Sequence, residues 1–165
     1  MARAAEVARA VLDTNVWLDW LVFDDPRVRP LRDASRSGHL RIVACPGARA
    51  ELADVLARPG LIAQGFASRE RRGVARFDAA RLMEEFDAAV ALCARAPACG
   101  LDCRDPDDQR FVDLAVAQSA HYLLTRDRAL LALARAARKR FGLLITRPEG
   151  LGTNDERAPR WAHPL

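Results

Sequence analysis

Four acidic residues lie in separate parts of the chain, at positions from which a parallel α/β fold can bring them together. Asp13 and Asp127 each follow a short apolar run, Asp108 opens a helical stretch, and Glu51 lies about one turn inside another. Carboxylates that converge repel one another unless cations or protons intervene. Hard oxygen ligands with water completing the shell suit Mg²⁺ or Mn²⁺. Such ions activate water and stabilise the leaving oxygen of a phosphodiester, so the pattern predicts metal-dependent hydrolysis without a serine or histidine nucleophile.

Strands and helices must bring these acids to one place. The apolar runs predict strands at residues 9–12, 40–44, 121–125 and 141–145. Apolar residues at helical spacing predict helices at 16–22, 26–36, 46–57, 78–93, 108–119 and 128–140, while 65–73 is either a loop or a short helix. This alternation predicts a three-layer α/β/α sandwich with a central parallel sheet. Ligands bind at the carboxyl ends of parallel strands, and there we expect the four acids to meet.

Polar residues beside the strand ends also have structural interpretations. Asp13 and Asp127 could each cap the helix that follows, although Asn15 is available to cap the first. Thr14, Asn15 and Thr125 are candidates for orienting a carboxylate or a water molecule from outside the ligand set. They could equally satisfy only the backbone of their turns.

The two helical acids have close competitors. Asp54 lies one turn after Glu51 and could take its place, or both could face solvent. The third acid could be Asp105, Asp107 or Asp108, and any of these could simply cap the helix. The residues alone leave these choices open.

The composition is that of a soluble globular protein. The chain has 165 residues, of which 50% are hydrophobic and 29% charged. We expect one domain at 1–147 followed by a polar tail at 148–165. No apolar stretch approaches the roughly 20 residues that span a bilayer. No apolar signal core follows Met1, so the sequence predicts a cytoplasmic protein without membrane contact.

Positive charge gathers near the carboxyl end of the sequence. The net charge is +4, and Lys139 is the only lysine. Between residues 126 and 147 the basic residues greatly outnumber the single acid, Asp127. A basic surface of this kind could hold RNA phosphates, with Arg126, Arg138, Lys139 and Arg140 as the candidate residues. A solvated helix face explains the same charges equally well.

Four segments taken in order resemble the PIN-domain family, especially its branch of toxins from toxin–antitoxin pairs. These segments are Val11–Val16, Cys45–Leu52, Asp105–Ala115 and Tyr122–Leu131. Each is a weak motif alone, but their order and separation together cover nearly the whole chain. In the third segment Asp108 stands seven residues before Ala115, which matches the acid of the family.

The resemblance implies a PIN-like fold that cleaves single-stranded RNA with a divalent metal. Its ligands would be Asp13, Glu51, Asp108 and Asp127. The resemblance also implies that the protein is often a homodimer, and it makes an antitoxin protein a candidate partner. One departure is Arg126, which stands where a small residue is common. Trp17 and Trp20 are bulky residues of the first helix that suit either the core or a dimer interface.

Other classes of protein remain open from the sequence. A PIN-like module could bind RNA or protein without cutting, although all four expected ligands are present. A phosphoryl-transfer domain with Asp13 as nucleophile would need a second acid two residues later, where the chain has Asn15, or a lysine near the last strand. A DNA-directed nuclease would need clamping elements for which the short chain has little room.

Overall fold

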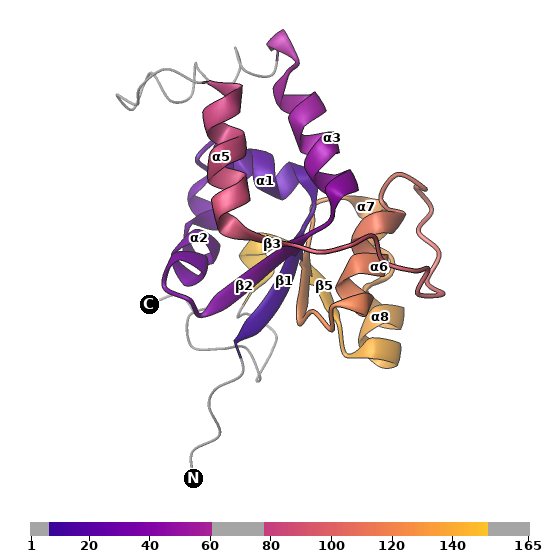
Figure 1. Ribbon diagram of the computed structural model, residues 1–165. Helices are drawn as coiled ribbons and strands as arrows, with labels where there is room; N and C mark the ends of the chain where they lie inside the picture. Colours follow the sequence, from indigo (N-terminus) through magenta and orange to yellow (C-terminus); the bar gives the residue numbers. More distant parts are fainter. Residues whose placement is uncertain (1–6, 61–77, 152–165) are drawn as a thin grey trace.

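A five-stranded, all-parallel sheet forms the centre of the protein (Figure 1). The computed structural model describes residues 7–60 and 78–151. The strands are β1 (Ala8–Leu12), β2 (Leu40–Ala44), β3 (Val90–Leu92), β4 (Tyr122–Leu124) and β5 (Leu144–Thr146), in the order β3-β2-β1-β4-β5. Ala10 lies opposite Ile42 on one side and Tyr122 on the other. The chain thus winds outward in both directions from β1, and the crevice of such a sheet opens between β1 and β4.

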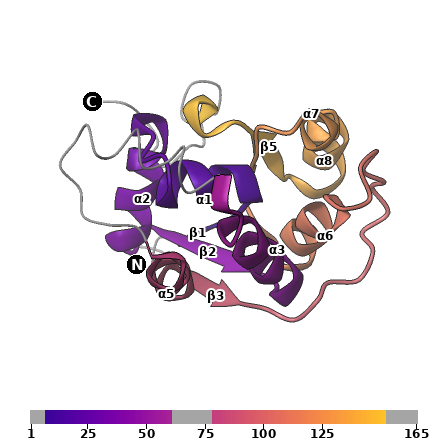
Figure 2. The same ribbon diagram turned by 90° about the horizontal axis from the view of Figure 1, so that it is seen from above.

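Helices cover both faces of the sheet (Figure 2). The helical elements are α1 (Thr14–Leu21), η1 (Pro26–Val28), α2 (Arg29–Arg36), α3 (Pro46–Leu56), α5 (Ala79–Ala89), α6 (Gln109–Ala117), α7 (Arg128–Leu131), α8 (Ala134–Phe141) and η2 (Pro148–Gly150). One core contains α1, α2, α5 and most of the buried residues of α3, and the other contains α6, α7 and α8. The predicted three-layer α/β/α sandwich is therefore confirmed.

Alternation along the strands divides the two cores. In β1, Ala10 and Leu12 join the first core and Val11 joins the second, because successive side chains of a strand point to opposite faces. Trp17 packs in the first core, with ring centroids 5.1 Å from Trp20 and 4.6 Å from Phe86. Both tryptophans are almost fully buried, so they are core residues of the single chain.

The predicted helix at 78–93 is wrong at its end. The structure has α5 up to Ala89, after which Val90 turns to an extended backbone and opens β3. β3 pairs with β2 and forms one edge of the described sheet. Neither glycine nor proline marks the change, and Val90 and Cys93 continue the helical spacing of the apolar residues before them. The helical pattern therefore concealed the edge strand.

The last part of the described chain also differs in detail. The single helix predicted at 128–140 is two helices, α7 and α8. Phe141, predicted to start a strand, ends α8, and Gly142 follows in the left-handed conformation that commonly terminates a helix. Pro148 is buried in η2, and Leu151 joins the first core, while the predicted domain boundary at 147 stays a prediction. The segment 65–73 lies outside the described residues.

No helix among the described residues has the length and apolar character needed to cross a bilayer.

Candidate functional site

One buried hydroxyl joins two of the predicted acids. Asp13 follows β1, and Thr125 and Asp127 follow β4, the neighbouring parallel strand. The Thr125 hydroxyl donates to Asp13 Oδ2 and accepts a hydrogen bond from the Asp127 backbone N–H at 2.9 Å. Thr125 is 0% exposed, so water does not compete for these bonds. Thr125 therefore fixes the two acids relative to each other.

Both strand-end acids also cap helices. Asp13 Oδ1 accepts from the Val16 backbone N–H at 2.9 Å, so Asp13 and not Asn15 caps α1. Asp127 Oδ1 accepts from the backbone N–H groups of Ala129 and Leu130 at 2.6 and 3.1 Å and caps α7. In each case the cap uses Oδ1. The structural and functional interpretations of these acids are thus compatible, because capping fixes each carboxylate through Oδ1 and leaves Oδ2 for another partner, which for Asp13 includes the Thr125 hydroxyl.

The two helical acids have unused bonding capacity. Asp108 occupies the cap position of α6, but its side chain makes no capping hydrogen bond. Glu51 Oε2 is buried without a hydrogen-bond partner among the described residues and lies 3.8 Å from Arg110 Nη1. Asp54, the competitor of Glu51, is exposed. Asp105 is also exposed, and its Oδ1 accepts from the Asp107 backbone N–H at 3.0 Å.

The acids share one electrostatic environment. Desolvation raises the pKa of Asp108 to about 7, helped by the negative charges of Asp127, Asp105, Asp13 and Glu51. Burial also raises the pKa of Asp13, while the bond from Thr125 opposes this rise. The charges of the other three predicted acids therefore all reach the Asp108 carboxyl group. No three histidine, cysteine or acidic side chains of residues 7–60 and 78–151 form a finished ligand group, so this region is not a closed coordination shell.

Comparison with protein families identifies the chain. The sequence profile of the PIN domain matches residues 9–129. The chain belongs to the PIN-domain family. A solved structure with a similar fold is that of VapBC2 from Rickettsia felis bound to a DNA fragment from the promoter; the match has a TM-score of 0.52 and 14% identity and covers 83% of this chain and 96% of that one. A search of the curated proteins finds no match.

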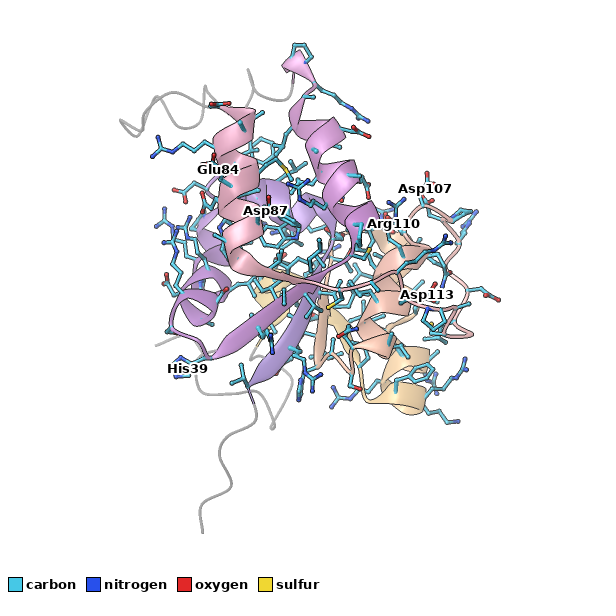
Figure 3. All side chains as sticks on the ribbon, viewed as in Figure 1. His39, Glu84, Asp87, Asp107, Arg110 and Asp113 are labelled. Carbon is cyan, nitrogen blue, oxygen red and sulfur yellow. The ribbon has the colours of Figure 1, made fainter. Side chains whose placement is uncertain are left out.

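The donor atoms of this PIN domain fit a hard divalent cation. Carboxylates dominate the site, and both Glu51 Oε2 and Thr14 Oγ1 are buried without a hydrogen-bond partner in the described structure. His39 and His121 precede β2 and β4, and so lie at the amino edge of the sheet, away from the acids. Figure 3 shows His39 far from Asp107. The oxygen donors of the four candidate acids favour Mg²⁺ or Mn²⁺ over zinc.

The Arg126 guanidinium forms ion pairs with three carboxylates. Its Nε lies 2.6 Å from Asp19 Oδ2, its Nη1 2.9 Å from Glu149 Oε1, and its Nη2 3.8 Å from Asp25 Oδ2. These ion pairs connect the loop after β4 to α1, η1 and η2 of the PIN domain. The guanidinium that was a candidate for RNA binding is thus neutralised within the fold.

The other candidate RNA-binding residues lie far from the acids. Arg138, Lys139 and Arg140 form the last turn of α8, and β5 follows within a few residues. Because β5 is parallel to β4, the chain has returned to the amino edge of the sheet by the end of α8. The acids lie at the opposite, carboxyl edge. Arg140 also donates to the Gly100 carbonyl at 2.6 Å.

Two contacts of α6 were not predicted. Arg110, which Figure 3 shows near Asp107, donates to the carbonyls of Gly47 and Asp107, both at 2.9 Å, and lies 3.8 Å from Glu51. The sequence feature that could have identified Arg110 is its place two residues after Asp108, in the first turn of a helix. Gln109 and Asp113 are one turn apart on α6 and bond to each other at 2.9 Å.

These two α6 side chains hold the preceding connection. Gln109 accepts from the Cys103 backbone N–H at 2.7 Å and donates to the Leu101 carbonyl at 2.8 Å. Asp113 accepts from the Cys99 backbone N–H at 2.9 Å. The irregular segment that leads to Asp108 is therefore fixed to the helix that Asp108 starts.

The raised pKa of Asp108 predicts that the metal-free protein loses stability as the pH rises. The stabilising contribution is fully present below pH 3.8, the ordinary pKa, and is lost as the pH rises through about 7. Thermal melts in EDTA should show this fall, and millimolar Mg²⁺ should reverse it by binding the ionised form.

Asp108→Asn provides the sharpest check of this expectation. In EDTA at pH 8 the variant should melt above the wild type, whereas exposed Asp107→Asn should melt with it. An Asp108→Asn variant that melts below the wild type at pH 8 would contradict carboxylate repulsion at this position.

Proposed function

We propose that this PIN domain is a divalent-metal-dependent endoribonuclease that hydrolyses phosphodiester bonds in single-stranded RNA. PIN domains are generally nucleases. The main support in this chain is the Asp13–Thr125–Asp127 unit, with Asp108 in the same electrostatic environment. With Glu51, these three acids would hold Mg²⁺ or Mn²⁺. A bound ion of this kind supplies Lewis acidity and lowers the pKa of water.

The chain itself contributes position and charge. Thr125 and the α1 cap orient Asp13, and the α7 cap orients Asp127, so little conformational freedom is lost when they bind a ligand. The unpartnered Thr14 hydroxyl can accept or donate a hydrogen bond beside Asp13. Asn15, exposed in the first turn of α1, can orient a water molecule at the rim.

We further propose that the protein is the toxin of a toxin–antitoxin pair. The motif resemblance and the likeness of its fold to a VapBC2 chain support this role. It implies a cytoplasmic protein with an antitoxin partner, and a homodimer is the expected assembly. Expression of the chain alone should then stop growth, and co-expression of the antitoxin should restore it.

A cleavage assay tests the proposed activity. Labelled single-stranded RNA should be cut with Mg²⁺ or Mn²⁺, left intact in EDTA, and cut again when metal is restored. DNA of the same sequence should be cut far more slowly; equal or faster cutting of DNA would favour a DNA-directed nuclease.

The absence of a finished ligand group among the described residues favours one alternative, a PIN domain that binds RNA or protein without cutting. Binding of RNA without cutting, with either metal and several RNA sequences, would support that alternative and overturn the proposed activity.

A further inference from the structure

Two hollows meet at Pro106, in the loop just before Asp108. The first has a volume of about 610 Å³ and is lined by Arg104, Asp105, Asp127 and Arg128, with small residues between them. This hollow therefore includes one of the candidate metal ligands.

The second hollow, of about 520 Å³, is lined by Pro46, Gly47, Arg95, Gln109 and Arg110 among others. Arg110 lies 3.8 Å from Glu51, so this hollow borders a second candidate ligand. Together the two hollows extend to either side of the loop that carries Asp105 and Asp108.

Each hollow presents two arginines. Arg95, Arg104 and Arg128 are exposed, and within the described ranges none of their side chains has a hydrogen-bond or ion-pair partner. Arg110 donates to the carbonyls of Asp107 and Gly47 through Nε and Nη1 and lies 3.8 Å from Glu51, so its Nη2 is the group left for a phosphate. A guanidinium that is not paired with a carboxylate can offer its fork of N–H donors to a phosphate.

Acids alone would repel the substrate of the proposed nuclease. A polynucleotide carries one negative charge per phosphate, so cations must flank a carboxylate centre that receives it. The four arginines of the hollows lie at the carboxyl edge, close to Asp127 and Glu51. The basic turn at Arg138–Arg140 lies at the other edge of the sheet.

We propose that the backbone of single-stranded RNA crosses the acid cluster with one stretch in each hollow. Arg104 and Arg128 bind phosphates on one side of the cleaved bond, and Arg95 and Arg110 bind phosphates on the other. This inference rests on the proposed function for its substrate class, and it identifies the surface that the substrate uses.

The lining also indicates how the strand is recognised. The residues between the arginines are small or short, including Ala129 and Ala132 in the first hollow and Gly47 and Ala96 in the second. None of the lining residues is aromatic, so the hollows offer no platform for stacking bases. Contacts here are to phosphates, and they add affinity without reading sequence.

Binding measured in EDTA tests the surface independently of cleavage. Fluorescence anisotropy of a short labelled single-stranded RNA should show that Arg104→Ala/Arg128→Ala weakens binding by about tenfold or more at low salt. The slope of log affinity against log salt should flatten by about 1.4, which is about 0.7 for each of two phosphate contacts. Arg95→Ala should produce about half of that change in slope. Arg138→Ala/Lys139→Ala removes the same charge from α8 and should change affinity less than twofold.

The binding results test the proposed RNA path through the two hollows and not the cleavage activity. Equal losses in both double variants would mean that only net charge matters and would overturn the path, as would a wild type that does not bind RNA at low salt. A strong dependence on RNA sequence that disappears in Arg104→Ala/Arg128→Ala would contradict phosphate recognition. Loss of binding in this variant and not in the α8 control supports the path even if no RNA is cut. Cleavage with unchanged affinity in this variant would leave the nuclease standing and overturn the path.

Discussion

Asp13→Asn is expected to abolish metal-dependent RNA cleavage while leaving the fold intact. Asparagine keeps the side-chain oxygen that caps α1 at the Val16 N–H but removes the negative charge that a cation needs. Metal assistance contributes several kcal/mol to such reactions, and each 1.4 kcal/mol is a factor of ten in rate. We therefore expect kcat to fall by at least about a hundredfold.

Stability should move little, and in the opposite direction to activity. Asp13 is 2% exposed, and burial raises its pKa, so its charged form is costly in the metal-free fold. A neutral amide avoids that cost. Its NH2 group takes the place of Oδ2 and donates to the Thr125 oxygen in place of accepting from it, so the melting temperature in EDTA should stay the same or rise.

Asp54→Asn is the matched control for Asp13→Asn. It makes the same chemical change at an exposed acid of α3 and should leave both cleavage and melting unchanged. Cleavage rates and thermal melts of the three proteins decide the matter. Wild-type activity in Asp13→Asn would rule out the proposed metal centre.

The sequence predicted β1, β2 and β4 to within a residue at each end but missed β3. β1 and β4 are buried apolar runs that stop at polar residues which cap the next helix, so hydrophobicity and capping mark the same boundary. β3 has only three residues and follows α5 directly. Its pairing with β2 is a tertiary contact, which the periodicity of the sequence does not reveal.

In the candidate site, too, the features that follow from local sequence could be predicted and those that depend on tertiary contacts could not. The proximity of Asp13 and Asp127 could be predicted because a parallel sheet sends neighbouring strand ends to one edge. The bridge through Thr125 could not, because it depends on which rotamer a buried hydroxyl takes between two strands.

The cations were harder still to place. Density of charge along the chain directed attention to residues 126–140, yet Arg126 is neutralised and Arg138 lies at the far edge. Arg95 and Arg104 belong to an irregular connection without periodicity. Only the folded chain brings them beside the acids.

Thr125→Val should uncouple the two strand-end acids without changing the shape of the core. Valine fits the same buried space but can neither donate to Asp13 nor accept from the Asp127 N–H. Leaving a buried donor unsatisfied costs about 1–3 kcal/mol, so the variant should melt several degrees lower. Partners that orient metal ligands typically contribute about 10–100-fold to affinity or activity, and we expect a loss of that size.

A shift in the pH profile separates positioning from mere stability. The Thr125 hydroxyl lowers the pKa of Asp13, against the larger effect of burial. Without it the pKa of Asp13 should rise further, so a higher pH is needed to ionise the ligand, and the acidic limb of the cleavage profile should move upward. Thr125→Ser restores the hydroxyl and should return that limb to its wild-type position, even if the lost methyl group keeps the melting temperature low. A variant that melts lower yet keeps the wild-type acidic limb would show that Thr125 supports the fold and not the carboxylate.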